Sequence, residues 1–283
     1  MKLRSTALAA LSLLVVAVPT AAQDPTSSSV LFDGMGFTFD QSIGSSVNVT
    51  QVPGESPEPT AFGAPDSPHL TFSVYGPRAE FAKMPRVGGT GTAVHFFPVA
   101  DQAPYKDALD ELDRLQAILA ARPDPAGLAT GGDALPYMPP VVDAAQMLRA
   151  RVSYVDLPGL QGISYLTAYG QDAYPFTSDR FQYVFEGLST DGRWYVAAIF
   201  DVTTDLFPKK VSAKDANRIV ATRKAYERYE AESRATLEGA AQDAFAPTLD
   251  AADALIASIV IEGVPVAGPA ADPVPAPSAS PAA

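Results

Sequence analysis

The sequence predicts an α+β protein built around an antiparallel sheet. Four consecutive strand-like segments occupy residues 148–203, and an amphipathic helical pattern occupies residues 103–121. Helical patterns return after residue 212 and end near residue 261 in a short β-branched run. Strands grouped together and helices placed before and after them are typical of the α+β class. We therefore expect the first helix and the C-terminal helices to pack against the sheet.

The clearest strand pair lies on either side of Asp191-Gly192. Apolar and polar residues alternate from Phe181 onward and again from Trp194 onward, as in strands with one buried face. A tight Asp-Gly turn with positive φ at both positions would connect them. A slip of one residue would split the apolar set between two faces. The predicted register pairs Phe185 with Ala198, Tyr183 with Phe200 and Phe181 with Val202.

The two strands before this hairpin are expected to share one apolar face. The turn between them lies at Pro158-Gly159, because both residues favour turns. The residues assigned to the shared face are Leu148, Ala150, Val152 and Tyr154, followed by Ile163, Tyr165 and Tyr169.

Residues 31–261 are expected to form a single domain. Strands are predicted at 31–40, 45–52, 69–75 and 92–99, after a disordered leader at 23–29 and around a Pro-rich loop at 53–67. Arg122-Pro123 ends the first helix, because the residue before Pro is pushed out of the α region. The Pro- and Gly-rich residues 123–140 form a long loop or a boundary between lobes.

The C-terminal part is expected to be helical and then disordered. Ser212 and Asp215 resemble a capping box, and Glu230 and Arg234 are spaced for an i,i+4 ion pair. A second helix from 249 runs into a short strand at 259–261. Residues 264–283 are rich in Pro and Ala and cannot bury a core, which predicts a disordered tail.

Residues 1–22 have the features of a secretory signal peptide. Lys2 and Arg4 precede a short apolar run, and small residues at 20–22 suit cleavage. We therefore expect an exported protein, periplasmic or extracellular, with no integral membrane span. The chain has no Cys and a net charge of −12. The acidic balance argues against nucleic acid and anionic membrane surfaces as partners.

The block Tyr154–Val202 resembles a family of uncharacterised secreted proteins and lipoproteins of bacteria. The resemblance lies in Gly162–Thr167, Tyr169-Gly170-Gln171, Phe185–Leu188 and Thr190–Val196. It brings no known activity, and the lipid-anchor Cys frequent in that family is missing here. The order of elements also resembles the PsbP/Mog1-like fold, with Asp191–Tyr195 and Leu255–Ile259 at matching places. This second resemblance concerns the fold alone.

The sequence contains no recognised catalytic motif, and we predict no cofactor, no metal site and no catalytic residue. There is no His-Glu-x-x-His, Gly-x-Ser-x-Gly or P-loop pattern. The two histidines, His69 and His95, lie in separate predicted strands. The spacing supplies no third metal ligand, and we expect the two imidazoles to lie too far apart to share one.

The loop between the two predicted hairpins supplies the candidate ligand-binding residues Tyr174, Phe176 and Arg180. Aromatic side chains on loops are available for contact, although Tyr174 and Phe176 could instead form a plug packed over the sheet edge. The sequence favours a secreted, non-enzymatic binding or scaffold module of the cell envelope, with an envelope protein or a glycan as its partner. The alternative is an extracytoplasmic hydrolase with an unrecognised active site.

Overall fold

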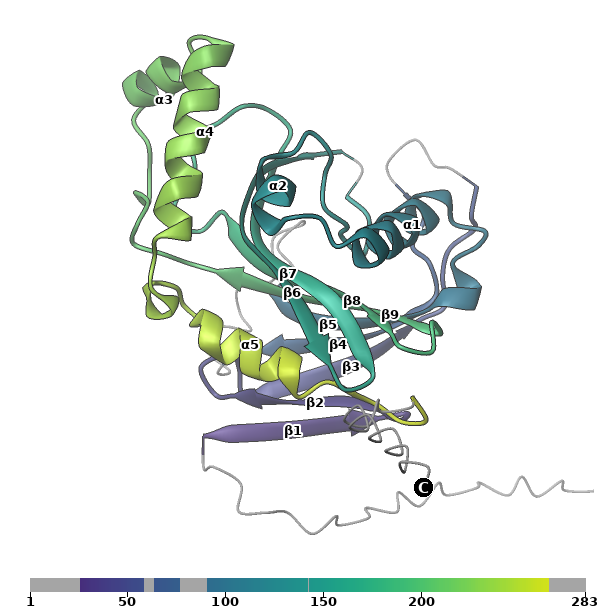
Figure 1. Ribbon diagram of the computed structural model, residues 1–283. Coiled ribbons are helices and arrows are strands. Elements are labelled where there is room, and N and C mark those ends of the chain that lie inside the picture. The colour runs from purple at the N-terminus through teal and green to yellow at the C-terminus, as the bar shows by residue number, and fades with distance from the viewer. Residues whose placement is uncertain (1–25, 59–63, 77–90, 142, 265–283) are drawn as a thin grey trace, which may run out of the picture.

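The computed structural model describes residues 26–58, 64–76, 91–141 and 143–264. The predicted signal peptide (1–22) and almost all of the predicted tail (265–283) lie outside the described residues. The described chain has the predicted α+β class: helices cover both faces of a large antiparallel sheet, and a small sheet lies below it (Figure 1).

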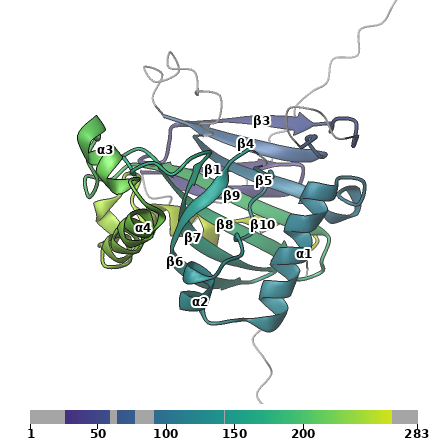
Figure 2. The same cartoon turned by 90° about the horizontal axis from the view of Figure 1, so that it is seen from above.

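The large sheet has seven strands, in the order β3-β4-β5-β9-β8-β7-β6 (Figure 2). Every neighbouring pair is antiparallel. The predicted four-strand meander forms one side of the sheet, and the N-terminal strands form the other. Their bounds are β3 Ser46–Val52, β4 His69–Tyr75, β5 Thr92–Pro98, β6 Ala145–Leu157, β7 Leu160–Gly170, β8 Phe181–Ser189 and β9 Trp194–Val202.

One face of the large sheet packs against the small sheet and the C-terminal helices. The small sheet consists of β1 (Ser27–Phe32), β2 (Met35–Asp40) and β10 (Val260–Ile261). Helices α4 (Arg223–Glu238) and α5 (Leu249–Ala257) complete this layer. The core between the layers is rich in aromatic side chains: Phe37, Phe39, Phe72, Phe96, Phe181, Phe185 and Phe200 are all buried there.

The opposite face is covered by α1 (Lys106–Ala121), α2 (Pro125–Thr130) and the segment 131–141. Hydrogen bonds to α1 and to the sheet hold this segment in place. Glu111 Oε2 accepts from the Tyr137 amide at 3.0 Å, Glu186 Oε1 accepts from the Met138 amide at 3.0 Å, and the Tyr165 hydroxyl donates to the Pro136 carbonyl. The predicted loop 123–140 therefore contains one short helix and a buried, hydrogen-bonded stretch.

The β8–β9 register is confirmed, but its turn differs from the prediction. Phe185 pairs with Ala198 and Tyr183 with Phe200, as the alternation indicates. Only Gly192 has a positive φ (71°), and the Gly192 amide donates to the Ser189 carbonyl at 2.8 Å. A longer loop with a glycine in the left-handed region is a common alternative to the two-residue turn. It preserves the same pairing.

The expected two-residue turn occurs instead at Asp33-Gly34. Both residues have positive φ, 51° and 76°, and Phe32 pairs with Met35 across the turn. The single strand predicted at 31–40 is therefore a hairpin. Residues 27–29, predicted as disordered leader, belong to its first strand. Asp33-Gly34, included in the predicted strand, is the turn that divides it.

The single shared face predicted for β6 is also wrong. The pairing of β6 with β7 shifts between Ala150 and Ser153, and Arg151 has a φ of 54°. A β-bulge adds one residue to a strand and so reverses which side chains point inward. Leu148 and Ala150 face the aromatic core, whereas Val152 and Tyr154 pack on the α1 side.

The bulge turns Arg151 toward the C-terminal end of α4. Its amide donates to Glu238 Oε1 at 2.6 Å, and Nη1 donates to the Ala240 carbonyl at 2.7 Å. The last carbonyl groups of a helix lack intrahelical partners, and a cation at this end is favourable. The bulge thus ties α4 to the edge strand.

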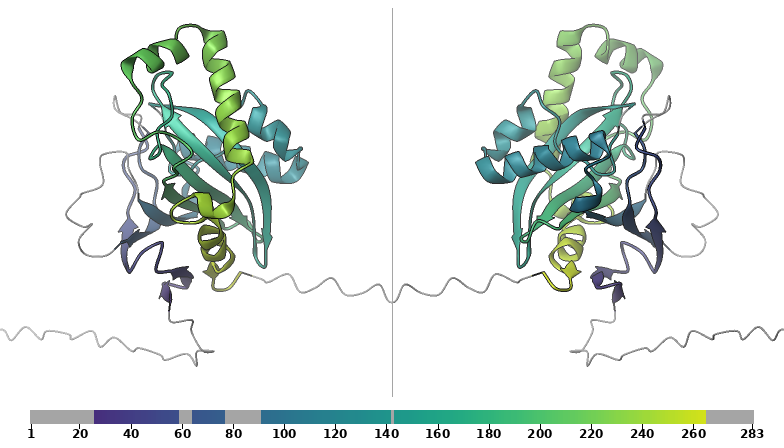
Figure 3. Two further views of the ribbon diagram at one scale, coloured as in Figure 1. Left: turned by 90° about the vertical axis from the view of Figure 1, so that its left-hand side faces the viewer. Right: turned by 90° about the vertical axis from the view of Figure 1, so that its right-hand side faces the viewer.

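The helical segment after residue 212 is divided in two. Helix α3 covers Ala213–Ile219, and Ser212 Oγ accepts from the Asp215 amide at 3.1 Å, as the capping-box pattern predicts. Thr222 Oγ1 caps the following helix, α4, by accepting from the Ala225 amide at 3.1 Å. The α3–α4 hairpin projects from the molecule at the end opposite β1 (Figures 1 and 3).

Candidate functional site

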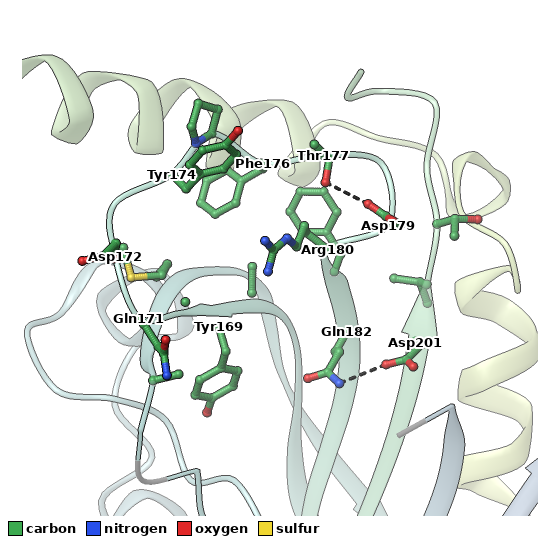
Figure 4. A pocket seen from close by; sticks show the side chains of 18 of the residues that line it. Tyr169, Gln171, Asp172, Tyr174, Phe176, Thr177, Asp179, Arg180, Gln182 and Asp201 are labelled. Carbon is green, nitrogen blue, oxygen red and sulfur yellow. Dashed lines mark hydrogen bonds between the residues drawn. The ribbon is translucent and has the colours of Figure 1, made fainter. Parts of the chain in front are cut away.

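A cleft of about 1030 Å³ opens where β6 begins, β7 and β9 end, and the β7–β8 loop crosses the sheet edge (Figure 4). Its size is at the upper end of the range for small-ligand sites. All three predicted ligand-binding residues, Tyr174, Phe176 and Arg180, line it. Lys209, from the segment after β9, joins them.

Phe176 fixes the β7–β8 loop over the sheet edge. Its side chain is 4 % exposed and packs against Phe181, Phe207 and Tyr229, with ring centroids 4.8–6.4 Å apart in this cluster. The Phe176 amide also donates to the Tyr229 hydroxyl at 2.7 Å. Phe176 is therefore a plug that makes one wall of the cleft, and the expectation of an exposed contact fails for this residue.

Tyr174 and Arg180 are the exposed members of the loop. The Tyr174 side chain is 52 % exposed, and the Arg180 guanidinium extends into the cleft (Figure 4). Among the described residues, no carboxylate forms an ion pair with Arg180. The neighbouring Asp179 is instead held by the Thr177 hydroxyl at 2.8 Å. The cleft thus contains both a free guanidinium and an exposed aromatic ring.

The floor of the cleft carries a hydrogen-bonded row of polar groups. The Tyr137 hydroxyl donates to Gln182 Oε1 at 2.9 Å, and Gln182 Nε2 donates to Asp201 Oδ1 at 3.0 Å. The Gly91 amide donates to Asp201 Oδ2 at 2.8 Å. Burial raises the pKa of Asp201, although the hydrogen bonds from Gln182 and Gly91 oppose that shift. These contacts fix the orientation of groups that can exchange hydrogen bonds with a bound molecule.

Three of these lining residues, Gln182, Asp201 and Lys209, were not among the predicted site residues. Gln182 and Asp201 lie at polar positions of the alternating hairpin, and such positions are expected to face solvent. The sequence feature that could have pointed to the site is the charged Asp201 between the apolar residues Phe200 and Val202 at the end of β9. Lys209 follows β9 in the sequence, and only the folded chain brings it beside the β7–β8 loop.

The two histidines lie side by side, contrary to expectation. The His69 and His95 ring centroids are 5.4 Å apart. In the β4–β5 register His95 opposes Thr71, so His69 is its diagonal neighbour on the same face, within the reach of long side chains. The His69 Nδ1 pairs with the Ser67 carbonyl at 2.7 Å, and the His95 Nδ1 pairs with the Thr71 hydroxyl at 3.0 Å.

His95 is buried in a neutral form. Burial, and secondly the neighbouring His69, lower the pKa of His95 to about 3. Its Nε2 has no hydrogen-bond partner among the described residues. Within the same ranges, no three His, Asp or Glu side chains are grouped so as to hold a metal ion. The pair is thus a buried polar contact of the sheet.

Glu186 is a second buried titratable group on the same face. It opposes Ala197 from one side, and His95 opposes Ala197 from the other. Burial raises the pKa of Glu186 well above its usual range. The nearby Tyr195 hydroxyl opposes this rise in the pKa. Neither that hydroxyl nor Glu186 Oε2, however, has a hydrogen-bond partner of ordinary geometry in the described part of the chain. The orphan oxygen indicates a carboxyl that is protonated when folded.

In the described ranges, no helix has the length and apolar character needed to cross a bilayer. No family model matches the chain. No curated protein matches it either.

Proposed function

We propose that this chain is an exported, non-enzymatic binding module of the cell envelope, and that its cleft binds an acidic glycan. The observation that carries the proposal is that the unpaired Arg180 guanidinium and the exposed ring of Tyr174 line the same cleft. A guanidinium binds a carboxylate through two parallel hydrogen bonds, and an exposed aromatic ring offers a flat apolar surface. A sugar ring that bears a carboxylate needs both.

The floor of the cleft supports the same ligand class. Gln182 and Asp201 present an amide and a carboxylate whose geometry is already fixed by hydrogen bonds. Sugar hydroxyl groups both donate and accept hydrogen bonds, so a row of such polar groups suits them. The apolar wall of Phe176 limits the width of the site. A hydrolase remains the alternative, with Asp201 as its acid.

A matched pair of sugars tests the proposal. The probes are 4-nitrophenyl β-glucuronide and 4-nitrophenyl β-glucoside, which differ only in the carboxylate. Calorimetric titration of the purified protein should give tighter binding of the glucuronide. Arg180→Ala should weaken glucuronide binding by about 10- to 100-fold, the value of a hydrogen bond to a charged group, and should leave glucoside binding unchanged. Arg193→Ala, in the turn at the start of β9, is the matched control.

Two outcomes would contradict the proposal. Equal affinity for the two sugars in wild type and Arg180→Ala would show that the sugar's carboxylate does not contribute to binding. Release of nitrophenol, abolished by Asp201→Asn, would replace the binding function with hydrolysis.

A further inference from the structure

The positive charge of this acidic protein is concentrated in one projecting segment. Residues 209–228 contain seven Lys or Arg and only two acids, a local charge of +5, so the remainder of the chain carries −17. We call residues 209–228 the basic arm. It comprises the segment before α3, the whole of α3, and the first part of α4 (Figures 1 and 3). The overall charge of −12 conceals this asymmetry.

The cations of the basic arm are accessible to a partner. All seven are exposed. Arg218 and Arg223 form surface ion pairs with Asp215 at 3.5 Å and Glu227 at 2.7 Å, which contribute little to stability. Lys209 lines the cleft. The remaining four, which have no ion pair with any described residue, are Lys210, Lys214, Lys224 and Arg228.

The stability of the arm does not explain these charges. Arg223 and Lys224 occupy the first turn of α4, and that turn contains no acid. The N-terminal end of a helix carries partial positive charge, so cations there are unfavourable. Residues that oppose a local rule without a structural gain point to a functional requirement.

Apolar side chains are exposed among these cations. Val220, in the turn between α3 and α4, is 37 % exposed and lies between Arg218 and Arg223 in the sequence. Leu206, just before the arm, is 41 % exposed. Cations interspersed with exposed apolar residues suit the headgroup region of a bilayer, where the charges meet anionic headgroups and the apolar groups enter the interface. A soluble polyanion would use only the cations.

We propose that the basic arm docks the protein on an anionic lipid surface. The partner is defined by its chemistry, a bilayer that contains anionic phospholipid. The inference is independent of the cleft and its ligand. It differs from the expectation based on net charge alone, because the local field within about a Debye length of the surface, near 10 Å, determines the contact.

The arm can be altered without disturbing the core. Its base is held by Phe207, buried between Phe176 and Phe181, and α4 is held by the buried Leu237. The exposed cations contribute nothing to either contact.

The test is sedimentation of the full chain with vesicles of equal parts phosphatidylglycerol and phosphatidylcholine, at low salt. The test variant replaces Lys210, Lys214 and Lys224 with Gln. Each Lys near an anionic surface strengthens binding about fivefold, so the triple change should weaken it about a hundredfold. The control replaces Lys106, Arg122 and Arg193 with Gln, which alters net charge equally but leaves the arm intact. It should bind like wild type.

Three results would overturn the inference. They are equal losses in the two triple variants, equal binding to pure phosphatidylcholine vesicles, and binding that is unchanged at about 0.5 M salt, where surface charges are screened. The variant Val220→Ser distinguishes a lipid partner from a soluble polyanion. It should weaken vesicle binding severalfold and should not change binding to heparin. Preference for heparin over vesicles, with no effect of Val220→Ser on either, would assign the arm to a polyanion instead.

Discussion

Acidification should weaken the fold through His95, because the buried imidazole resists protonation. The pKa is about 3 in the folded protein, against 6.5 in the unfolded chain. The folded state therefore binds fewer protons than the unfolded state between these values. Stability from this group is fully present above pH 6.5 and is lost as the pH falls. By pH 4 the difference is 2.5 pH units, about 3 kcal/mol at 1.36 kcal/mol for each unit.

The assay is urea denaturation of wild type and His95→Gln at pH 7, 5.5 and 4, followed by circular dichroism. Gln retains a polar group beside the Thr71 hydroxyl but cannot be protonated. Its free energy of unfolding should fall by about 3 kcal/mol less than that of wild type between pH 7 and pH 4. Carboxyl groups titrate in both proteins, so their contributions to the pH dependence of the free energy of unfolding cancel in the comparison. Parallel curves for the two proteins would refute the burial argument for His95.

Two further predictions concern the sheet. Phe200→Ala should reduce the free energy of unfolding by about 3–5 kcal/mol, because the ring is fully buried opposite Tyr183. Glu232→Ala, exposed on α4, should change the free energy of unfolding by less than about 0.5 kcal/mol. Equal losses for the two variants in urea denaturation would contradict the burial of Phe200. Glu186→Gln should stabilise the protein at pH 8 more than at pH 4. The pKa of Glu186 is raised in the folded state, so wild type loses stability as the pH rises, whereas the Gln variant does not. Thermal melts in which the substitution shifts the melting temperature equally at both pH values would exclude a protonated Glu186.

The parts of the fold that could be predicted have local signals. The β8–β9 pairing follows from alternation on both sides of a turn, and α1 follows from leucines at helical spacing before Arg122-Pro123. The bulge at Arg151 could not be predicted, because one extra residue leaves the composition of the strand unchanged while reversing its faces. The proximity of His69 and His95 depends on the β4–β5 register. The segment between these strands contains turn residues such as Gly88-Gly89, but a connection of this length does not determine which residues pair.

The candidate site was predictable only as a loop. Tyr174 and Arg180 belong to one segment rich in aromatic and polar residues, so the sequence places them together. Asp201 and Lys209 come from elements that the sheet order and the chain path bring to the same edge. Such long-range neighbours leave no periodic signal in a single sequence. The basic arm was visible in the sequence, but the net charge of the whole chain obscured it.

We propose that the cleft lined by Arg180 binds an acidic sugar. The most direct test of this binding is to map backbone amide chemical shifts while the isotope-labelled protein is titrated with 4-nitrophenyl β-glucuronide. We expect shifts that saturate and concentrate in residues 168–182 and 201–209, the two segments that supply most of the cleft lining. These shifts should largely disappear in Arg180→Ala. Shifts concentrated in the small sheet or on α1, or an identical pattern in Arg180→Ala, would contradict the assignment of this cleft as the binding site.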